Sequence, residues 1–176
     1  GAYWDTEVKR AQEQGLSSYP VFTRKASTDV SYLACVNRML EARTQIYPQF
    51  ATHNAHTIAY ILEQTGDDRD FEFQRLHGMG ESLYEEIVER PGADYACRVY
   101  APVGAHKDLL PYLVRRLLEN GANTSFVNRI TNENIDSTVI TRDPVVDTIE
   151  NQCSPHPRIP LPIDLYAPDR RNSQGL

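Results

Sequence analysis

Apolar positions recur along most of this chain with two different spacings. Five segments carry them at helical spacing and are predicted to be helices: residues 4–15, 27–42, 55–66, 81–90 and 107–119. Short apolar or aromatic stretches precede the last three of these helices, at residues 46–54, 71–80 and 95–104. The pattern therefore predicts three consecutive strand–turn–helix units.

The three predicted strands are evenly spaced. They end near Thr52, Leu76 and Tyr100, which are 24 residues apart in each step. Strands that alternate with helices of this length form parallel sheets, and the short constant period favours a (β/α)₈ barrel over a doubly wound sheet, although both fit. A whole barrel takes about 250 residues, so we expect 176 residues to hold about half of one, as a fragment.

The character of the sequence changes after Asn128. Residues 131–152 are mostly polar, with a short helix predicted near 143–151, and residues 153–176 are rich in proline. Proline at this density excludes a helix or a central strand. We therefore expect two parts, residues 1–130 as the α/β part and residues 131–176 as a polar segment with an extended linker that leads out of the domain.

Composition and charge exclude several classes of protein. The chain is 40% hydrophobic and 24% charged, as expected for a folded protein. Its net charge of −6 argues against a general nucleic-acid binder. No apolar run approaches the roughly 20 residues of a membrane span. The three cysteines have no metal-binding spacing, so we expect reduced thiols in a reducing compartment.

Polar and aromatic residues stand where the predicted strands end, which is where parallel α/β folds bind ligands. His53 and His56 could be metal ligands, but histidines at a helix start more often pair with backbone groups, and no third ligand is suitably placed. Gly78 and Gly80 could admit a phosphate to a helix N-terminus, although a plain turn is the commoner use. No catalytic nucleophile has recognisable spacing.

Two adjacent arginines interrupt the apolar helix at 107–119. On a helical wheel the leucines and valine cover an arc of about 180°, while Arg115, Glu119 and Arg116 follow at about 240°, 280° and 340°. One interpretation is a solvated face with Arg–Glu pairs worth a few tenths of a kcal/mol each. The other is a bidentate clamp for a small carboxylate or phosphate. Spacing alone slightly favours the solvated face.

Several long motifs carry a resemblance to a known family. They are "GAYWDTEVKRAQ", "YPVFTRK", "TDVSYLAC", "YPQFATHNAHT", "FEFQRLHGMGE", "RVYAPVGAHKDLLPYLVRRLLENGANTSFVNR" and "PHPRIPLPIDLY". Together they closely resemble the proline dehydrogenase domain of bacterial bifunctional proline utilization A, in the same order and over nearly the whole chain. The resemblance implies the C-terminal half of a distorted (βα)₈ barrel of TIM type that holds FAD.

The resemblance also implies roles for individual residues. Arg115 and Arg116 would hold the carboxylate of L-proline, and the groups around the substrate ring would be Tyr100, Leu76 and Tyr3. The residues that would contact FAD are Thr52 and His53 at one strand end, Glu119 near the ribityl chain, Thr23, Arg24 and Lys25 near the phosphates and adenosine, and Trp4 beside the adenine.

The implied reaction is oxidation of proline to pyrroline-5-carboxylate by hydride transfer to flavin N5, with electrons passed to a quinone. The parent protein would be a cytoplasmic bacterial homo-oligomer, peripheral at the inner membrane, with a downstream aldehyde dehydrogenase module. The family's lysine and aspartate on early strands would lie before Gly1. Two alternatives stay open: an inert fragment that acts as an association surface, and another flavin-dependent barrel such as a folate reductase.

Overall fold

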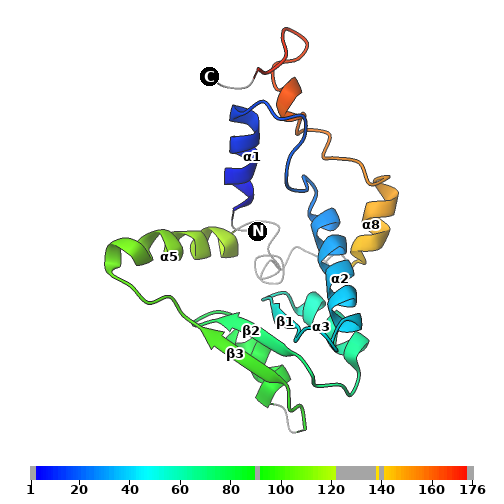
Figure 1. The fold of residues 1–176 in the computed structure, drawn as a ribbon, viewed down its shortest axis with the longest axis vertical. Helices are drawn as coiled ribbons and strands as arrows, with labels where there is room; N and C mark the ends of the chain where they lie inside the picture. The colour runs from blue at the N-terminus through cyan, green and yellow to red at the C-terminus, as the bar shows by residue number, and fades with distance from the viewer. Residues whose placement is uncertain (1–2, 90–91, 122–137, 139–140, 174–176) are drawn as a thin grey trace. The chain divides into compact units, whose positions relative to one another are not determined.

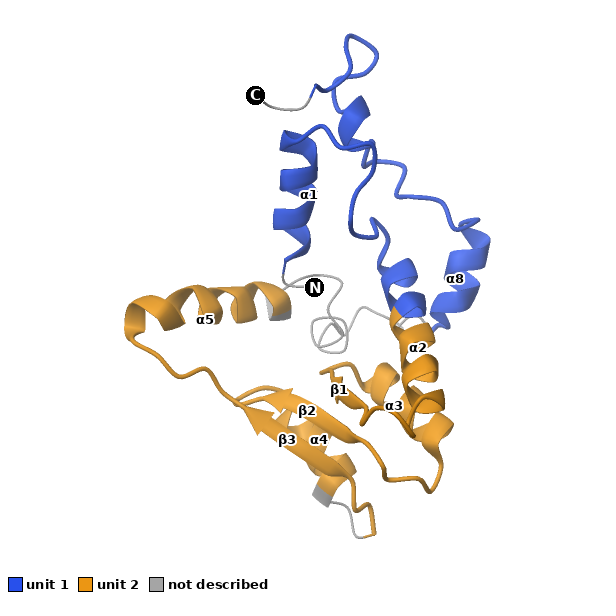
Figure 2. Ribbon diagram, viewed as in Figure 1, with its two compact units in different colours: residues 1–31, 142–176 blue, residues 32–141 orange. Residues whose placement is uncertain are grey.

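The computed structural model describes residues 3–89, 92–121, 138 and 141–173. The chain divides into two compact units (Figure 2). Unit 1 combines Gly1–Ser31 with Arg142–Leu176, and unit 2 is Tyr32–Thr141. Each unit has its own elements, and α2 (Lys25–Glu41) begins in the first and continues into the second.

Unit 2 contains a parallel sheet in the order β1–β2–β3, formed by Gln49–Ala51, Glu72–Leu76 and Ala96–Tyr100. Phe50 pairs with Phe73, and Phe73 pairs with Cys97. Helices follow each strand: α3 (Ala55–Thr65), α4 (Glu81–Tyr84) with the π-helical turn η1 (Glu85–Glu89), and α5 (His106–Gly121) (Figure 1). The three predicted strand–helix units and the parallel sheet are thus confirmed.

The core of unit 2 lies on one face of this sheet. Side chains from α2, α3, α4 and the strands meet there, and the buried cluster consists of Val36, Phe50, Ile58, Ile61, Phe71, Phe73 and Tyr84. The rings of Phe71 and Phe73 meet edge to face with centroids 5.3 Å apart, an arrangement that adds to the burial of their area. Strand residues alternate between faces, so the residues between these aromatic ones point to the opposite face.

The opposite face of the sheet carries a polar cluster around Glu72. Glu72 is 5% exposed, and its carboxylate accepts hydrogen bonds from Arg98 Nε and Nη2 at 2.8 and 2.9 Å. It also accepts from Gln49 Nε2 at 3.0 Å and from Gln74 Nε2 at 2.9 Å. One buried carboxylate therefore links β1, β2 and β3, and its charge is compensated by a bidentate guanidinium.

Unit 1 contains α1 (Trp4–Glu13), the start of α2, α8 (Pro144–Glu150) and the 3₁₀ turn η2 (Pro162–Asp164). The short helix predicted near 143–151 is α8, capped by Asp143, whose carboxylate accepts from Val145 N–H at 2.8 Å. α2 begins at Lys25, two residues before the predicted start at Ser27.

The proline-rich segment runs along the N-terminal part of unit 1. Tyr19 Oη donates to the carbonyl of Pro160 at 2.9 Å, and the amide of Asn172 donates to the carbonyl of Gln12. After Glu150 the described residues form only turns, extended chain and η2, as the proline content predicts. The predicted division at residue 130 stays a prediction, and residues 122–137, 139–140 and 174–176 lie outside the described residues.

Candidate functional site

The carboxyl ends of the three strands bring four predicted site residues to one edge of the sheet. Leu76 and Tyr100 end β2 and β3 and are direct register partners. Thr52 and His53 follow β1 directly. Tyr84 Oη donates to the carbonyl of Thr52 at 2.7 Å and so ties this strand end to α4. These four residues therefore lie at one edge of the sheet in unit 2, and ligand binding at this edge stays a prediction.

His53 lies against the end of β2. Its Nε2 accepts the backbone N–H of Leu76 at 3.2 Å, which is the backbone pairing that we favoured over metal binding. His56 is held by the cap of α3, where Asn54 Oδ1 accepts the His56 N–H at 3.0 Å. Burial lowers the pKa of His53, Glu119 opposes this shift, and Arg116 and Arg75 add to it. The ring is therefore neutral at pH 7.

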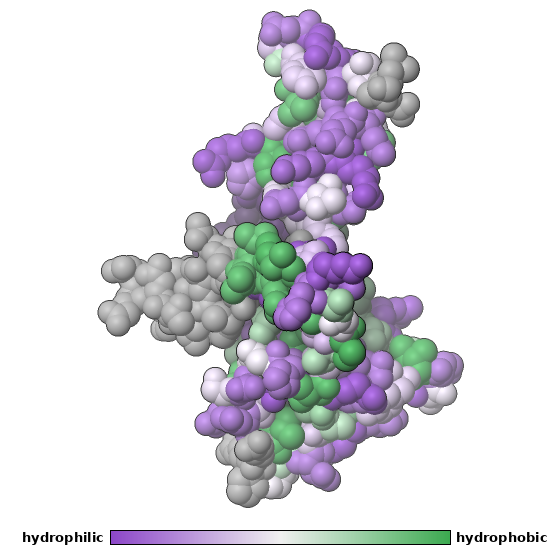
Figure 3. Space-filling view, turned by 90° about the vertical axis from the view of Figure 1, so that its left-hand side faces the viewer, coloured by the Kyte–Doolittle hydropathy of each residue, from purple (hydrophilic) through white to green (hydrophobic). Residues whose placement is uncertain are grey.

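The orientation of α5 is the reverse of what the wheel predicts. The side chains of its apolar arc are exposed, by 62% for Leu110 and 72% for Leu117. Figure 3 shows apolar side chains gathered on the surface at the level of α5. The side chain of Arg116 is only 21% exposed. An amphipathic helix usually turns its apolar stripe to the core, but α5 follows the irregular 101–105 segment and does not take part in the aromatic core.

The covered face of α5 carries the arginines, so the solvated-face interpretation is wrong for Arg116. Its Nη1 lies 2.8 Å from Glu119 Oε2, and its guanidinium carbon lies 5.2 Å from the centroid of the Tyr112 ring. The predicted Arg–Glu pair is thus present. Arg116 Nη1 and Glu119 Oε2 are within ion-pair distance, but their relative direction does not meet the requirement for a hydrogen bond. Arg116 Nε and Glu119 Oε2 are both buried and have no hydrogen-bond partner among the described residues. Arg115 on the same helix is half-buried.

The charges of Arg116 and Glu119 on α5 influence the pKa values of His53 and Tyr100 at the strand ends. Burial raises the pKa of Tyr100, and the charges of Arg116 and Glu119 act on this phenol as they act on His53. Tyr100 is 41% exposed and stays protonated at pH 7. The structure thus groups a neutral phenol, a neutral imidazole and a partly buried guanidinium, which are all hydrogen-bond donors for an anionic or carbonyl-bearing ligand.

The remaining predicted site residues belong to unit 1. Trp4 Nε1 donates to the carbonyl of Phe22 at 2.8 Å, and the neighbouring Tyr3 is 57% exposed. Thr23 Oγ1 accepts the N–H of His156 at 2.9 Å, and Lys25 pairs with Asp29.

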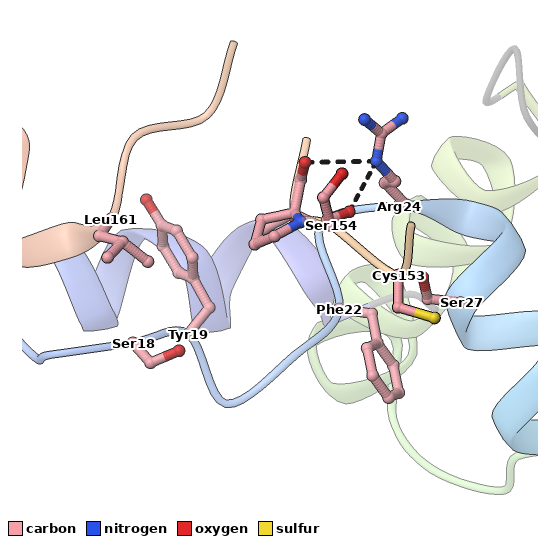
Figure 4. A pocket seen from close by; sticks show the side chains of 10 residues that line it. Ser18, Tyr19, Phe22, Arg24, Ser27, Cys153, Ser154 and Leu161 are labelled. Carbon is pink, nitrogen blue, oxygen red and sulfur yellow. Dashed lines mark hydrogen bonds between the residues drawn. The ribbon is translucent and has the colours of Figure 1, made fainter. Parts of the chain in front are cut away.

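Arg24 lies at a small pocket of unit 1 between the loop before α2 and the segment after α8. Its Nε donates to the carbonyls of Ser154 and Pro155 at 2.8 and 3.3 Å, and its terminal nitrogens point away from them (Figure 4). The residues that line this pocket are Ser18, Tyr19, Phe22, Thr23, Arg24, Ser27, Cys153, Ser154, Pro155 and Leu161. Arg24 is thus anchored through one nitrogen with the others directed outward.

Sequence reasoning missed two features of unit 2. One is the Glu72–Arg98 pair, whose only signal is a charged residue between two phenylalanines in "FEF". The other is the contact between Gly80 and the ring of His53, because a Cβ at Gly80 would lie 3.0 Å from His53 Cδ2. Gly80 follows the turn closed by Met79 N–H and the carbonyl of Leu76, which agrees with the plain-turn interpretation.

None of the described helices is both long and apolar enough to span a membrane.

Comparisons with known proteins agree with the resemblance seen in the sequence. Residues 1–129 match the family described as proline dehydrogenase. The bifunctional protein PutA of Klebsiella aerogenes is 55% identical over the whole chain, which spans 14% of that relative's length. The recognition made from the motifs is therefore confirmed.

Two solved structures extend the comparison to the fold. A mutant of proline utilization A from Bradyrhizobium japonicum matches with a TM-score of 0.92 at 58% identity, over 100% of this chain and 18% of that one. Proline utilization A from Bdellovibrio bacteriovorus inactivated by N-propargylglycine matches with a TM-score of 0.77 at 35% identity, over 91% of this chain and 16% of that one. The predicted fold class, part of a TIM-type barrel, is confirmed by these matches.

Proposed function

Because the chain belongs to the proline dehydrogenase family, we propose that it supplies the substrate-binding helix and part of the cofactor site of an FAD-dependent enzyme that oxidises L-proline to pyrroline-5-carboxylate. The observation that carries this proposal is the orientation of α5, whose partly buried Arg116 and Glu119 act on His53 and Tyr100 at the strand ends.

The two arginines bind the carboxylate of proline in this proposal. A guanidinium offers a planar fork of donors that matches a carboxylate, and the buried Nε of Arg116 lacks a hydrogen-bond partner among the described residues. Glu119 lies beside Nη1 at 2.8 Å, and the Tyr112 ring lies at 5.2 Å, so the side chain is oriented before a ligand arrives. Arg115, one residue earlier on α5, supplies the second guanidinium.

In this proposal Leu76 and Tyr100 of unit 2 contact the substrate ring, and Tyr3, which belongs to unit 1, has that role on the resemblance alone. Leu76 and Tyr100 are register partners on neighbouring strands, so their side chains share one face of the sheet. The pKa of Tyr100 is raised by burial, which keeps the phenol as a donor close to the arginines. These groups bind and orient proline, and apolar contact with Leu76 excludes water from the reacting carbon.

The residues present fit a flavin cofactor. When bound, FAD would supply the hydride acceptor, flavin N5. Thr52, His53 and Glu119 would hold it in unit 2, and His53 is neutral with an accessible Nδ1 that has no hydrogen-bond partner among the described residues. In unit 1 the residues would be Thr23, Arg24 and Lys25 for phosphates and adenosine, with Trp4 for the adenine. The outward terminal nitrogens of Arg24 suit a phosphate.

The wider setting follows from the family alone. Electrons would pass to a quinone, and a downstream aldehyde dehydrogenase module would consume the product. A relative of this chain carries the name bifunctional protein PutA. The parent would be a cytoplasmic homo-oligomer that visits the inner membrane peripherally.

One observation favours the second candidate, an association surface. The apolar arc of α5 is exposed, and its members are Leu110, Leu113, Val114, Leu117 and Leu118. Light scattering and a flavin absorbance spectrum on purified protein separate the two candidates, because an association surface gives concentration-dependent oligomers without bound flavin.

Substitution of Arg116 by lysine tests the proposal in the full-length protein. Lysine keeps the charge but not the fork, and a charge-assisted hydrogen bond contributes about 1.5–3 kcal/mol. We expect Arg116→Lys to lower kcat/KM for proline by about 10- to 150-fold, with flavin content unchanged. Prolinol lacks the carboxylate, so it should be a poor substrate that loses little more in the variant.

Arg38→Lys is the matched control for this experiment. Arg38 forms the same i,i+3 pair with Glu41, but the two side chains are 83% and 63% exposed. We expect normal kinetics for this variant. Equal fractional losses on proline and prolinol in Arg116→Lys would contradict the carboxylate clamp.

A further inference from the structure

The ring of His53 is fixed by the end of β2 in a way that decides where its proton lies. The backbone N–H of Leu76 donates to Nε2 at 3.2 Å. A ring nitrogen that accepts a hydrogen bond cannot carry a proton, so the proton of the neutral imidazole is on Nδ1. Nδ1 is therefore a donor, and no described residue accepts from it.

The turn after β2 holds this ring from a second side. Gly80 has φ +66°, and a Cβ built there would lie 3.0 Å from His53 Cδ2 and 3.6 Å from Tyr84 Cδ2. The ring thus occupies the space that a side chain at residue 80 would need. Gly78 in the same turn has φ +75°, but a Cβ there would meet nothing within 4 Å. Both glycines suit the left-handed backbone, and only Gly80 also makes room for His53.

The surrounding charges favour the neutral ring. Burial is the main influence and lowers the pKa of His53, Arg116 on α5 and Arg75 on β2 lower it further, and Glu119 on α5 raises it. A neutral ring is required for Nε2 to keep its bond to Leu76. The hydrogen bond from Leu76 therefore selects the tautomer, the space at Gly80 fixes the ring, and the surrounding charges keep it neutral.

We propose that the 77–80 turn and the Leu76 N–H are a positioning device that holds His53 as the Nδ1–H tautomer, so that Nδ1 donates to an acceptor oxygen of the bound cofactor. This inference rests on the proposed function for the identity of the cofactor, although the tautomer itself does not. His53 is the binding residue, and Gly80 acts through it. The acceptor is a phosphate oxygen or a ring carbonyl, which are alike as hydrogen-bond acceptors.

The tautomer can be measured without any ligand. Long-range ¹H–¹⁵N correlation spectra of the chain labelled with ¹⁵N-histidine distinguish the two neutral tautomers, and His53→Ala identifies the His53 signals among those of the five histidines. We expect the Nδ1–H form at pH 7. The commoner Nε2–H form, or a doubly protonated ring, would overturn the proposal.

Two glycine variants then test the positioning role in the full-length protein. Gly80→Ala and Gly78→Ala carry the same kind of backbone strain, because both residues have positive φ. Only Gly80→Ala should displace the ring. We expect it to weaken FAD binding by about 2- to 12-fold, the range for one hydrogen bond, with a changed His53 spectrum. Gly78→Ala should keep both at wild-type values, and equal losses in the two variants would overturn the proposal.

His53 variants separate the two ring nitrogens. Asparagine places an amide donor near the position of Nδ1, and glutamine places one near Nε2, so His53→Asn should retain FAD better than His53→Gln and His53→Ala. The reverse order would contradict donation from Nδ1. Riboflavin and ADP locate the acceptor. A preference for His53→Asn over His53→Gln that persists with riboflavin but not with ADP indicates a ring carbonyl, and one that persists with ADP but not with riboflavin indicates a phosphate.

The two hypotheses fail in different ways. A wild-type protein that retains no FAD would refute the proposed function, while the tautomer spectrum and the contrast between Gly80→Ala and Gly78→Ala in that spectrum would still decide the positioning role. A wild-type protein that binds FAD but shows the Nε2–H form would refute only the inference about His53.

Discussion

The buried carboxylate of Glu72 should make the stability of unit 2 depend on pH. Its side chain is 7% exposed, and hydrogen bonds led by those from Arg98 lower its pKa from 4.5 to about 2. Because the folded pKa is below the unfolded one, the ionised carboxylate stabilises the fold fully above pH 4.5. This contribution is lost as the pH falls from 4.5 towards 2.

The structure limits the size of this effect. The full difference between pKa values of 4.5 and about 2 corresponds to about 3 kcal/mol at 1.36 kcal/mol per unit. Arg98 is 63% exposed, and the carboxylate is covered by the side chains that bind it rather than by a thick layer of protein. Water therefore screens part of the interaction, and we expect about 1–2 kcal/mol.

Glu72→Gln tests this expectation because it keeps the shape and removes the charge. Urea unfolding followed by far-UV circular dichroism should give a free energy of unfolding about 1–2 kcal/mol below wild type at pH 7. The difference should shrink below pH 4.5 and approach zero near pH 2. Tryptophan fluorescence is unsuitable, since the only tryptophan, Trp4, lies in unit 1.

Glu41→Gln is the control, because Glu41 pairs with Arg38 on the exposed face of α2. Such surface pairs are worth about 0.5 kcal/mol or less. The reasoning about Glu72 would be refuted by a difference that stays constant down to pH 2.5, or by one no larger than that of Glu41→Gln.

Two further predictions concern the chain itself. Asn54→Ala removes the side chain that caps α3 through the His56 N–H, and it should lower the free energy of unfolding by about 1 kcal/mol in urea titrations; Asn54→Asp, which keeps an acceptor, should stay near wild type. The 176-residue chain alone should show no proline:dye oxidoreductase activity, because its described sheet has three strands whereas a complete barrel has eight; robust turnover with one FAD per chain would contradict this.

The fold and the strand ends were predictable because they depend on local periodicity. The even spacing of Thr52, Leu76 and Tyr100 follows from units of constant length, and neighbouring parallel strands then align their carboxyl ends. The start of α2 at Lys25 was missed, since Ser27 and Thr28 resemble caps but lie within the first turn.

The orientation of α5 could not be predicted from its wheel. The rule that an apolar stripe faces the core assumes that the helix packs on that core, and α5 does not contribute to the aromatic cluster of unit 2. The Glu72 network was hidden for a related reason. A buried charge is tolerable only with partners, and those partners stand on other strands, at Gln49 and Arg98.

The end of β2 connects the two halves of the proposed site in unit 2. Leu76 faces the proposed substrate pocket with its side chain, next to Tyr100 in the register, while its backbone N–H holds the ring of His53 on the proposed cofactor side. Arg116 and Glu119 act on both His53 and Tyr100. A change in the register of β2 or in the turn at Gly80 would therefore move substrate-binding and cofactor-binding groups together. The geometry of the proposed site in unit 2 therefore depends on β2, which the Glu72 carboxylate links to both neighbouring strands. A strand with hydrogen bonds on both sides holds its end residues more firmly than a loop does.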